Sequence, residues 1–279
     1  MKPSIKRSQI ANMNTHYKRY SLDYYLDAQQ KLGISNIALW AGPPHFWIDY
    51  LSYGDCKSLK RKLNSRGLTC VCLCATASQY RNQYCIYEPE HRERSFRYFT
   101  NGLKVAAELG CHSFHVNSGW GYKTEQRKDA WERSKDMLIR MADVAQQLQI
   151  VLTMECLRPD ETDLVVTLAD AKRMFTEINH PVLKIMLDTN PMAVANETIW
   201  KWFETFGDNI QNTHFIDCTP HGHLIWGDGT MPLENMLLCL NHYNYTGYLC
   251  QEITDIRYMQ DPMAADLRNM QTLLRYVND

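Results

Sequence analysis

The sequence predicts an α/β fold, a single (β/α)8 TIM barrel that spans residues 1–279 as one catalytic domain. Short apolar segments rich in β-branched residues recur at intervals of about 35 residues, and each is followed by a longer segment with helical periodicity. Eight such pairs favour a closed parallel barrel, whose usual size is about 250 residues. A doubly wound open sheet is the alternative, but the sequence after the first strand lacks the Gly-rich G-x-G-x-x-G turn of that fold.

The predicted elements alternate strictly along the chain. The strand candidates are Gln9–Met13, Asn36–Trp40, Thr69–Leu73, Ser113–Asn117, Ile150–Glu155, Leu183–Asp188, Asn212–Ile216 and Tyr248–Ile253. The helix candidates are Leu22–Leu32, Lys57–Arg66, Glu93–Leu109, Asp129–Gln149, Leu168–Ile178, Glu197–Phe206, Leu233–His242 and Ala264–Val277. Four helices are followed by a glycine, as expected of C-terminal caps, at Gly33, Gly67, Gly110 and Gly207.

The composition is that of an ordinary water-soluble protein, with 45% hydrophobic residues, 22% charged residues and a net charge of -1. Basic residues are spread among acidic ones, which argues against a nucleic-acid partner, because phosphate neutralisation needs a concentrated basic surface. The sequence has neither a run of about 18 apolar residues that could span a membrane nor an apolar N-terminal stretch for secretion. We therefore expect a cytoplasmic location and no membrane partner.

Ten cysteines occur without a C-x-x-C pair, and we interpret them as reduced thiols. Cys70, Cys72 and Cys74 alternate along a predicted strand and should share one face. A soft-metal site is one interpretation of that face, and packing of small side chains is the favoured one.

Four consecutive predicted strands carry a potential metal ligand at or near their carboxyl ends: Glu155 in LTMEC, Asp188 in IMLDT, His214 in THFID and Glu252 in LCQEI. Each lies about one βα repeat from the next, so closure of the barrel would bring all four to the mouth where barrels of this kind bind ligands. Any one of them alone could be a cap or an ion-pair partner. Three buried carboxylates together need compensation, and one divalent metal ion would supply it.

The donor set suits Mn2+, Mg2+, Co2+, Ni2+ or Zn2+ without selecting among them.

The chain resembles the xylose isomerase-like superfamily of sugar isomerases and epimerases, and within it the 3-epimerases that act on fructoselysine, D-tagatose and D-psicose. The resemblance runs nearly end to end. The segments that carry it, besides the four ligand positions, are LGISNIALWAGPPHF, YEPEHRERSF, the E-x-x-x-P-x-E pattern from Glu155 to Glu161, HLIWGDGTMPL and EITDIRYMQDP.

The resemblance implies that Glu155 and Glu252 bind the metal and flank the substrate on opposite sides. One would remove a proton from the carbon next to the substrate carbonyl and the other would return it, through an enediolate that the metal stabilises. Asp188 and His214 would be ligands alone. It implies that Glu161 holds a substrate hydroxyl or a water beside the metal. Ketohexose 3-epimerases place a His three residues after the metal Asp and an Arg six residues after the metal His. Pro191 and Pro220 stand there in this chain, so those two substrate contacts do not carry over.

These residues predict a small-molecule sugar or sugar-amine substrate and an epimerase acting at C3 of a ketose or ketoamine. An aldose–ketose isomerase on the same site is the nearest alternative. An apurinic-site endonuclease, which needs several zinc ions and binds a polyanion, and a non-catalytic sugar-binding module are more distant ones. By analogy with the family, the chain could form a homo-oligomer, either a dimer or a tetramer.

Predicted substrate contacts are Glu161, His45, Trp120 and His223, since sugar sites combine aromatic walls with a few placed polar groups. For each loop aromatic, packing over the end of the barrel is the competing interpretation. His115 lies inside a predicted strand, and we assign it no functional role.

Overall fold

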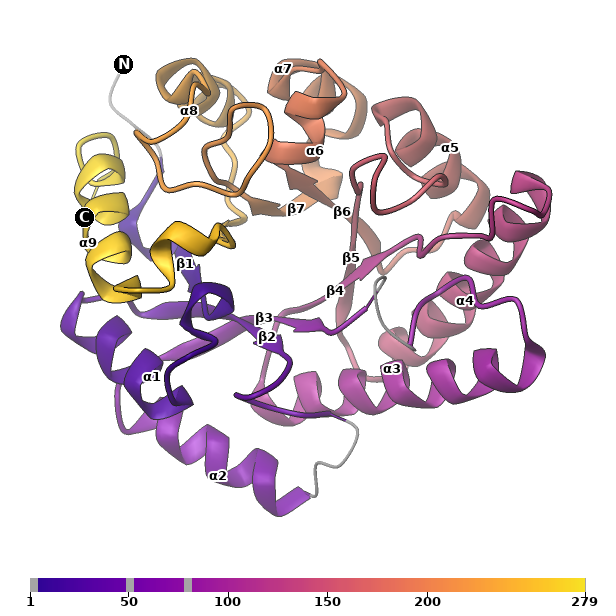
Figure 1. The fold of residues 1–279 in the computed structure, drawn as a ribbon, viewed down its shortest axis with the longest axis horizontal. Coiled ribbons are helices and arrows are strands. Elements are labelled where there is room, and N and C mark those ends of the chain that lie inside the picture. Colours follow the sequence, from indigo (N-terminus) through magenta and orange to yellow (C-terminus); the bar gives the residue numbers. More distant parts are fainter. Residues whose placement is uncertain (1–4, 49–52, 78–81, 279) are drawn as a thin grey trace.

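The structure is a computed structural model that describes residues 5–48, 53–77 and 82–278. Eight parallel strands close into a barrel in sequence order, with β8 hydrogen-bonded to β1 (Figure 1). Their bounds are β1 Ile10–Met13, β2 Asn36–Ala41, β3 Thr69–Ala75, β4 Ser113–Asn117, β5 Val151–Glu155, β6 Leu183–Asp188, β7 Ile210–His214 and β8 Tyr248–Gln251. The predicted (β/α)8 barrel is confirmed.

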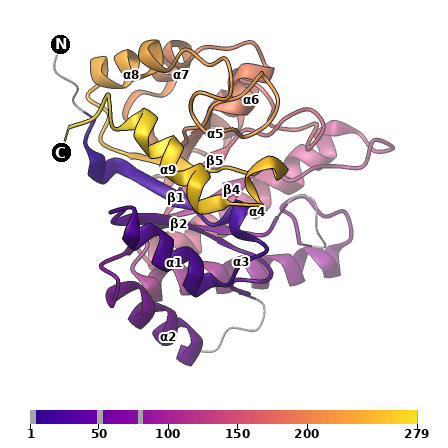
Figure 2. The same cartoon turned by 60° about the vertical axis from the view of Figure 1, so that its left-hand side comes forward.

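Helices surround this barrel on its outer side (Figures 1 and 2). Within the described residues the α-helices are α1 Leu22–Lys31, α2 Tyr53–Asn64, α3 Pro89–Leu109, α4 Arg127–Gln147, α5 Leu168–Ile178, α6 Thr189–Val194, α7 Ile199–Phe206, α8 Leu233–His242 and α9 Pro262–Leu273. Short 3-10 helices lie at Arg7–Gln9, Thr15–Tyr17, Gly207–Asn209 and Ile256–Tyr258. The six-residue helix α6 was not predicted, because it is too short to show a helical period.

Small and medium side chains fill the interior of the barrel, and larger ones pack between strands and helices. The inner cluster consists of Ala11, Met13, Ala38, Val71, Cys72, Cys74, Met186 and Cys250. All ten cysteines are buried and free. The prediction that three cysteines of β3 share one face is wrong: a bulge makes Ile37 pair with Cys70 and Ala38 with Cys72, and Cys70 packs in the outer core.

Two strands end earlier than predicted, and both ends shape the mouth of the barrel. Strand β7 stops at His214, and the amide of Ile216 then donates to the Thr189 hydroxyl at 3.1 Å. Strand β8 stops at Gln251, since the amide of Ile253 turns back to the Gln251 carbonyl at 3.1 Å. Glu252 therefore sits in a turn just past the strand.

A buried polar network joins helix α9 to the segment that follows β1, which lies beside it in Figure 2. The carboxylate of Asp266 lies 3.0 Å from Nε2 of His16, and it accepts hydrogen bonds from the Tyr17 hydroxyl at 2.7 Å and the Gln29 amide at 2.8 Å. All four side chains are fully buried. This network joins the last helix to the first βα unit, and so helps to hold the barrel closed.

Replacing Asp266 by alanine should lower the free energy of unfolding by at least about 3 kcal/mol, because three buried polar groups lose their acceptor. Urea denaturation measures this change. Asp136→Ala is the control, since that carboxylate is 65% exposed and lies 3.9 Å from Arg140 on the surface of α4. Its effect should stay within about 0.5 kcal/mol. Equal effects of the two substitutions would contradict the assigned role of the network.

No helix among the described residues is both long and apolar enough to cross a membrane.

Candidate metal centre

Four side chains meet at the carboxyl end of the barrel. Glu155, Asp188 and His214 are the last residues of β5, β6 and β7, and Glu252 follows the last residue of β8. Each offers one ligand atom, and these four atoms all lie within 4.8 Å of one another. The cluster therefore has the composition and the compactness that one divalent cation requires.

The closest contacts of the cluster centre on the His214 imidazole. Its Nδ1 atom lies 2.5 Å from Oε1 of Glu155, 3.2 Å from Oε2 of Glu252 and 3.7 Å from Oδ2 of Asp188. Yet Glu155 Oε1 and both ring nitrogens of His214 are buried without a hydrogen-bond partner. Buried polar atoms are rarely left unpaired in proteins, and a cation between them would satisfy these atoms. The residues fit such an ion.

The carboxylates of the cluster are ionised at neutral pH. Burial alone raises the pKa of Asp188, but the neighbouring His223 and His214 lower it to about 2. Burial also raises the pKa of Glu155 and of Glu252. In both cases the attraction of two neighbouring histidines outweighs burial, so that the pKa falls below its usual value: His214 and His115 act on Glu155, and His214 and His223 act on Glu252. The cluster thus gathers three negative charges in a space largely closed to water.

Two predicted substrate contacts lie together. Trp120 and Glu161 line one cavity of about 420 Å3, along with Tyr122 and Pro159. Oε2 of Glu161 accepts hydrogen bonds from the backbone amide of Arg158 at 3.2 Å and from its guanidinium at 3.1 Å. Burial raises the pKa of Glu161, although Arg158 opposes that effect. The cavity therefore has an aromatic wall and a fixed carboxyl group.

His45 is placed differently. Its Nε2 atom lies 3.1 Å from the carbonyl oxygen of Tyr17 and 3.0 Å from that of Tyr20, so this nitrogen carries the hydrogen. Its Nδ1 then accepts from the Asn14 amide at 2.8 Å, and Asn14 also bonds the backbone of Trp40 on β2. Both ring nitrogens of His45 are thus engaged within the protein, where they hold the loop after β1.

His223 contacts the acidic cluster directly. Its Nε2 lies 3.1 Å from Oδ2 of Asp188, and its Nδ1 lies 3.1 Å from the Thr254 hydroxyl. The loop that carries His223 is anchored by Asp217, whose carboxylate accepts from the backbone amides of Gly227, Gly229 and Met231 at 2.8 to 3.0 Å. A Cβ at Gly229 would lie 2.3 Å from that carboxylate, so only glycine fits there.

Sequence reasoning missed two of these residues. Asp217 stands in the motif THFID, but nothing in the sequence showed that it binds a loop about ten residues later. His115 on β4 lies 2.8 Å from Glu155 and is buried. A polar residue in the apolar strand SFHVN needs a buried partner, and that requirement was the signal for His115.

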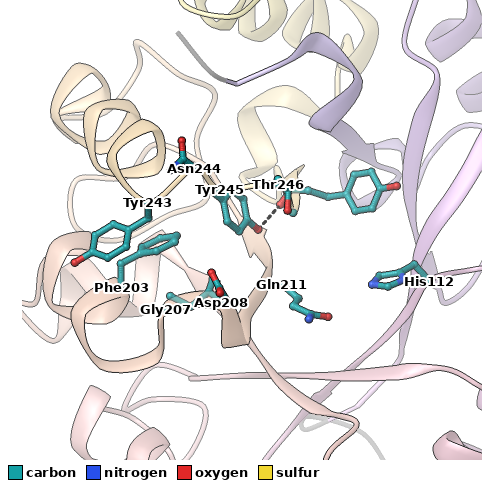
Figure 3. A pocket seen from close by; sticks show the side chains of 12 residues that line it. His112, Phe203, Gly207, Asp208, Gln211, Tyr243, Asn244, Tyr245 and Thr246 are labelled. Atoms are coloured by element: carbon teal, nitrogen blue, oxygen red, sulfur yellow. Dashed lines mark hydrogen bonds between the residues drawn. The ribbon is translucent and has the colours of Figure 1, made fainter. Parts of the chain in front are cut away.

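A second cavity, of about 440 Å3, lies at the opposite end of the barrel (Figure 3). His112 and Gln211 point toward the same space there, and Tyr248 at the start of β8 also lines it. The acidic cluster belongs to the other end, where the strands finish. Because barrels of this architecture carry out their chemistry at the carboxyl ends of the strands, we place the functional site there.

The sequence profile of the xylose isomerase-like TIM barrel family matches residues 26–275, which is most of the chain. The chain belongs to the xylose isomerase-like TIM barrel family.

Curated proteins that the chain matches are carbohydrate epimerases, and epimerases are isomerases. Fructoselysine 3-epimerase of Escherichia coli O157:H7 is 22% identical over 249 residues, which cover 88% of this chain and 90% of that protein. D-psicose 3-epimerase of Ruminiclostridium cellulolyticum is 24% identical over 234 residues, 82% of this chain and 77% of that protein.

Among solved structures, the apo form of 3-keto-D-glucoside 4-epimerase from E. coli superposes with a TM-score of 0.81 at 18% identity. The match covers 96% of this chain and 99% of that one. At this identity the superposition shows a shared fold.

A divalent cation should raise the melting temperature of the EDTA-treated protein, because a ligand of the folded state stabilises it by about 2.7 kcal/mol at a hundredfold excess over Kd. His214→Ala should abolish that rise, since it removes the imidazole at the centre of the cluster. His242→Ala is the control, because this exposed histidine ends α8. Thermal unfolding with Mn2+, Mg2+, Co2+, Ni2+ and Zn2+ measures the effect. A wild-type protein that responds to none of them would contradict the site.

Proposed function

We propose that the protein is a divalent-metal-dependent sugar epimerase that inverts C3 of a ketose or of a ketoamine of the fructoselysine type. The observation that carries the proposal is the convergence of Glu155 and Glu252 with Asp188 and His214 at the carboxyl end of the barrel. Glu155 ends β5 and Glu252 follows β8, and β6 and β7 lie between these two strands, so the glutamates approach the centre from different sides.

Each glutamate has a defined task in this proposal. Inversion requires that one group remove the C3 proton from one face and that another return a proton to the opposite face. Glu155 and Glu252 are ionised, and so each can accept a proton from the substrate when it lies on the correct side. A divalent cation in the cluster would supply Lewis-acid stabilisation of the charge on the substrate oxygens. Asp188 and His214 complete the set of ligands.

The substrate would extend from the cluster toward Trp120 and Glu161. An indole face covers the C–H side of a sugar, and a fixed carboxyl group orients hydroxyls. The curated relatives favour C3 as the reacting carbon, because the names of both specify a 3-epimerase. The fold alone does not distinguish positions, since a 4-epimerase shares it.

The identity of the labelled carbon separates the competing reactions. Candidate ketoses and fructosamine-type adducts incubated with the metal-loaded protein in heavy water should gain deuterium at C3 and yield the C3 epimer. An aldose–ketose isomerase would instead place deuterium at C1 or C2. NMR spectroscopy of the sugars measures both outcomes, and label confined to C1 or C2 would overturn the proposal.

Glu155→Gln and Glu252→Gln should each lower kcat by about 10²–10⁴-fold, because each removes one proton-transfer group while keeping the side-chain size. Glu204→Gln, on the exposed face of α7, is the matched control and should keep full activity. Steady-state kinetics on the epimerised sugar measure the effect. A kcat equal to that of the wild type in either of the two site variants would rule out the assigned pair.

A further inference from the structure

His115 contacts Glu155, one of the two proposed proton-transfer groups, from deeper inside the barrel. It lies in the middle of β4, and its Nε2 is 2.8 Å from Oε2 of Glu155 at the end of β5. In the β4–β5 ladder His115 pairs with Thr153 and Asn117 with Glu155, so His115 stands two residues deeper in the barrel on the same face. His115 is 8% exposed and Glu155 is 5% exposed.

The contact makes the two oxygens of Glu155 unequal. Oε2 is taken by His115, whereas Oε1 lies 2.5 Å from His214 Nδ1 and has no hydrogen-bond partner. A carboxylate only accepts hydrogen bonds, so the hydrogen of this contact sits on the imidazole nitrogen. Without this donor, the terminal torsion of a glutamate is soft and either oxygen could turn toward the cluster.

Asp188 shows the same kind of restraint in another form. Its Oδ1 accepts from the backbone amide of Asn190 at 2.7 Å, and His223 lies 3.1 Å from its Oδ2. A backbone amide thus fixes the orientation of the Asp188 carboxylate, whereas the side chain of His115 fixes that of Glu155. The ring of His115 also packs near that of His214, with 5.6 Å between ring centroids, so it has little room to move.

We propose that His115 is a positioning residue that donates to Oε2 of Glu155 and thereby turns Oε1 toward the cation, with the second lone pair of Oε2 left for the substrate proton. The inference rests on the proposed metal-dependent function. It adds a histidine that acts through a ligand rather than as a ligand. Groups that orient metal ligands in this way typically change metal affinity by about 10–100-fold when they are removed.

His115→Gln and His115→Asn make a matched pair for the test. Both carry a primary amide, but the longer glutamine places its NH2 group near the position of Nε2, and asparagine falls short of Oε2. Calorimetric titration of the EDTA-treated variants with Mn2+ should give a near wild-type Kd for His115→Gln and a Kd about 10–100-fold higher for His115→Asn. The visible spectrum of bound Co2+ should likewise be kept by His115→Gln and altered by His115→Asn.

The melting temperatures of the metal-free variants show whether both fold, and His115→Leu gives a third measurement if His115→Asn does not. The same Kd for wild type, His115→Gln and a folded variant without the donor would overturn the inference and leave the proposed epimerase intact. The expected pattern of Kd values without epimerisation of any sugar would support the positioning role while the proposed function fails. A wild-type protein that binds no divalent cation would overturn both.

Discussion

The mutual repulsion of three ionised carboxylates in a nearly closed space is the constraint on which the rest of this structure depends. Glu155, Asp188 and Glu252 keep their charges because neighbouring histidines, His214 among them in each case, lower their pKa values. Yet Oε1 of Glu155 and both ring nitrogens of His214 are buried without a hydrogen-bond partner. A charge cluster of this kind is costly in a protein interior unless a cation or a full set of hydrogen bonds compensates it. The parallel barrel supplies the geometry, because consecutive strands β5 to β8 end at the same rim.

The surroundings of the cluster hold its members from several directions. Asp188 doubles as the N-cap of α6, so the short helix begins at the ligand and fixes its orientation. The Asp217 carboxylate accepts hydrogen bonds from three backbone amides of the loop after β7. The same loop places His223 within hydrogen-bond distance of Asp188. The buried carboxylate of Asp266 ties α9 back to the start of the barrel. The His223–Asp188 contact and the contacts of Asp266 join segments from different βα units, so the site and the closure of the fold are stabilised together.

The sequence predicted the features that repeat along the chain. The eight strands and the four residues of the cluster follow one βα period, and therefore the sequence alone predicts that the four residues meet. The sequence did not predict features that depend on how neighbouring strands pair. The bulge in β3, the turn that ends β8 at Gln251 and the His115–Glu155 contact depend on register, which periodicity does not encode. The substrate contact of His45 stays a prediction, and the sequence did not show that both of its ring nitrogens bond to the segment after β1.

The central claim is that one cation binds where these four side chains meet. A crystal structure of the Zn2+-loaded protein, with the ion located by its anomalous scattering, tests the claim most directly. The account predicts one ion at the carboxyl end of the barrel, with an atom each of Glu155, Asp188, His214 and Glu252 at about 2.0–2.2 Å. An ion bound elsewhere, or four side chains that turn away from one another in the loaded crystal, would contradict it.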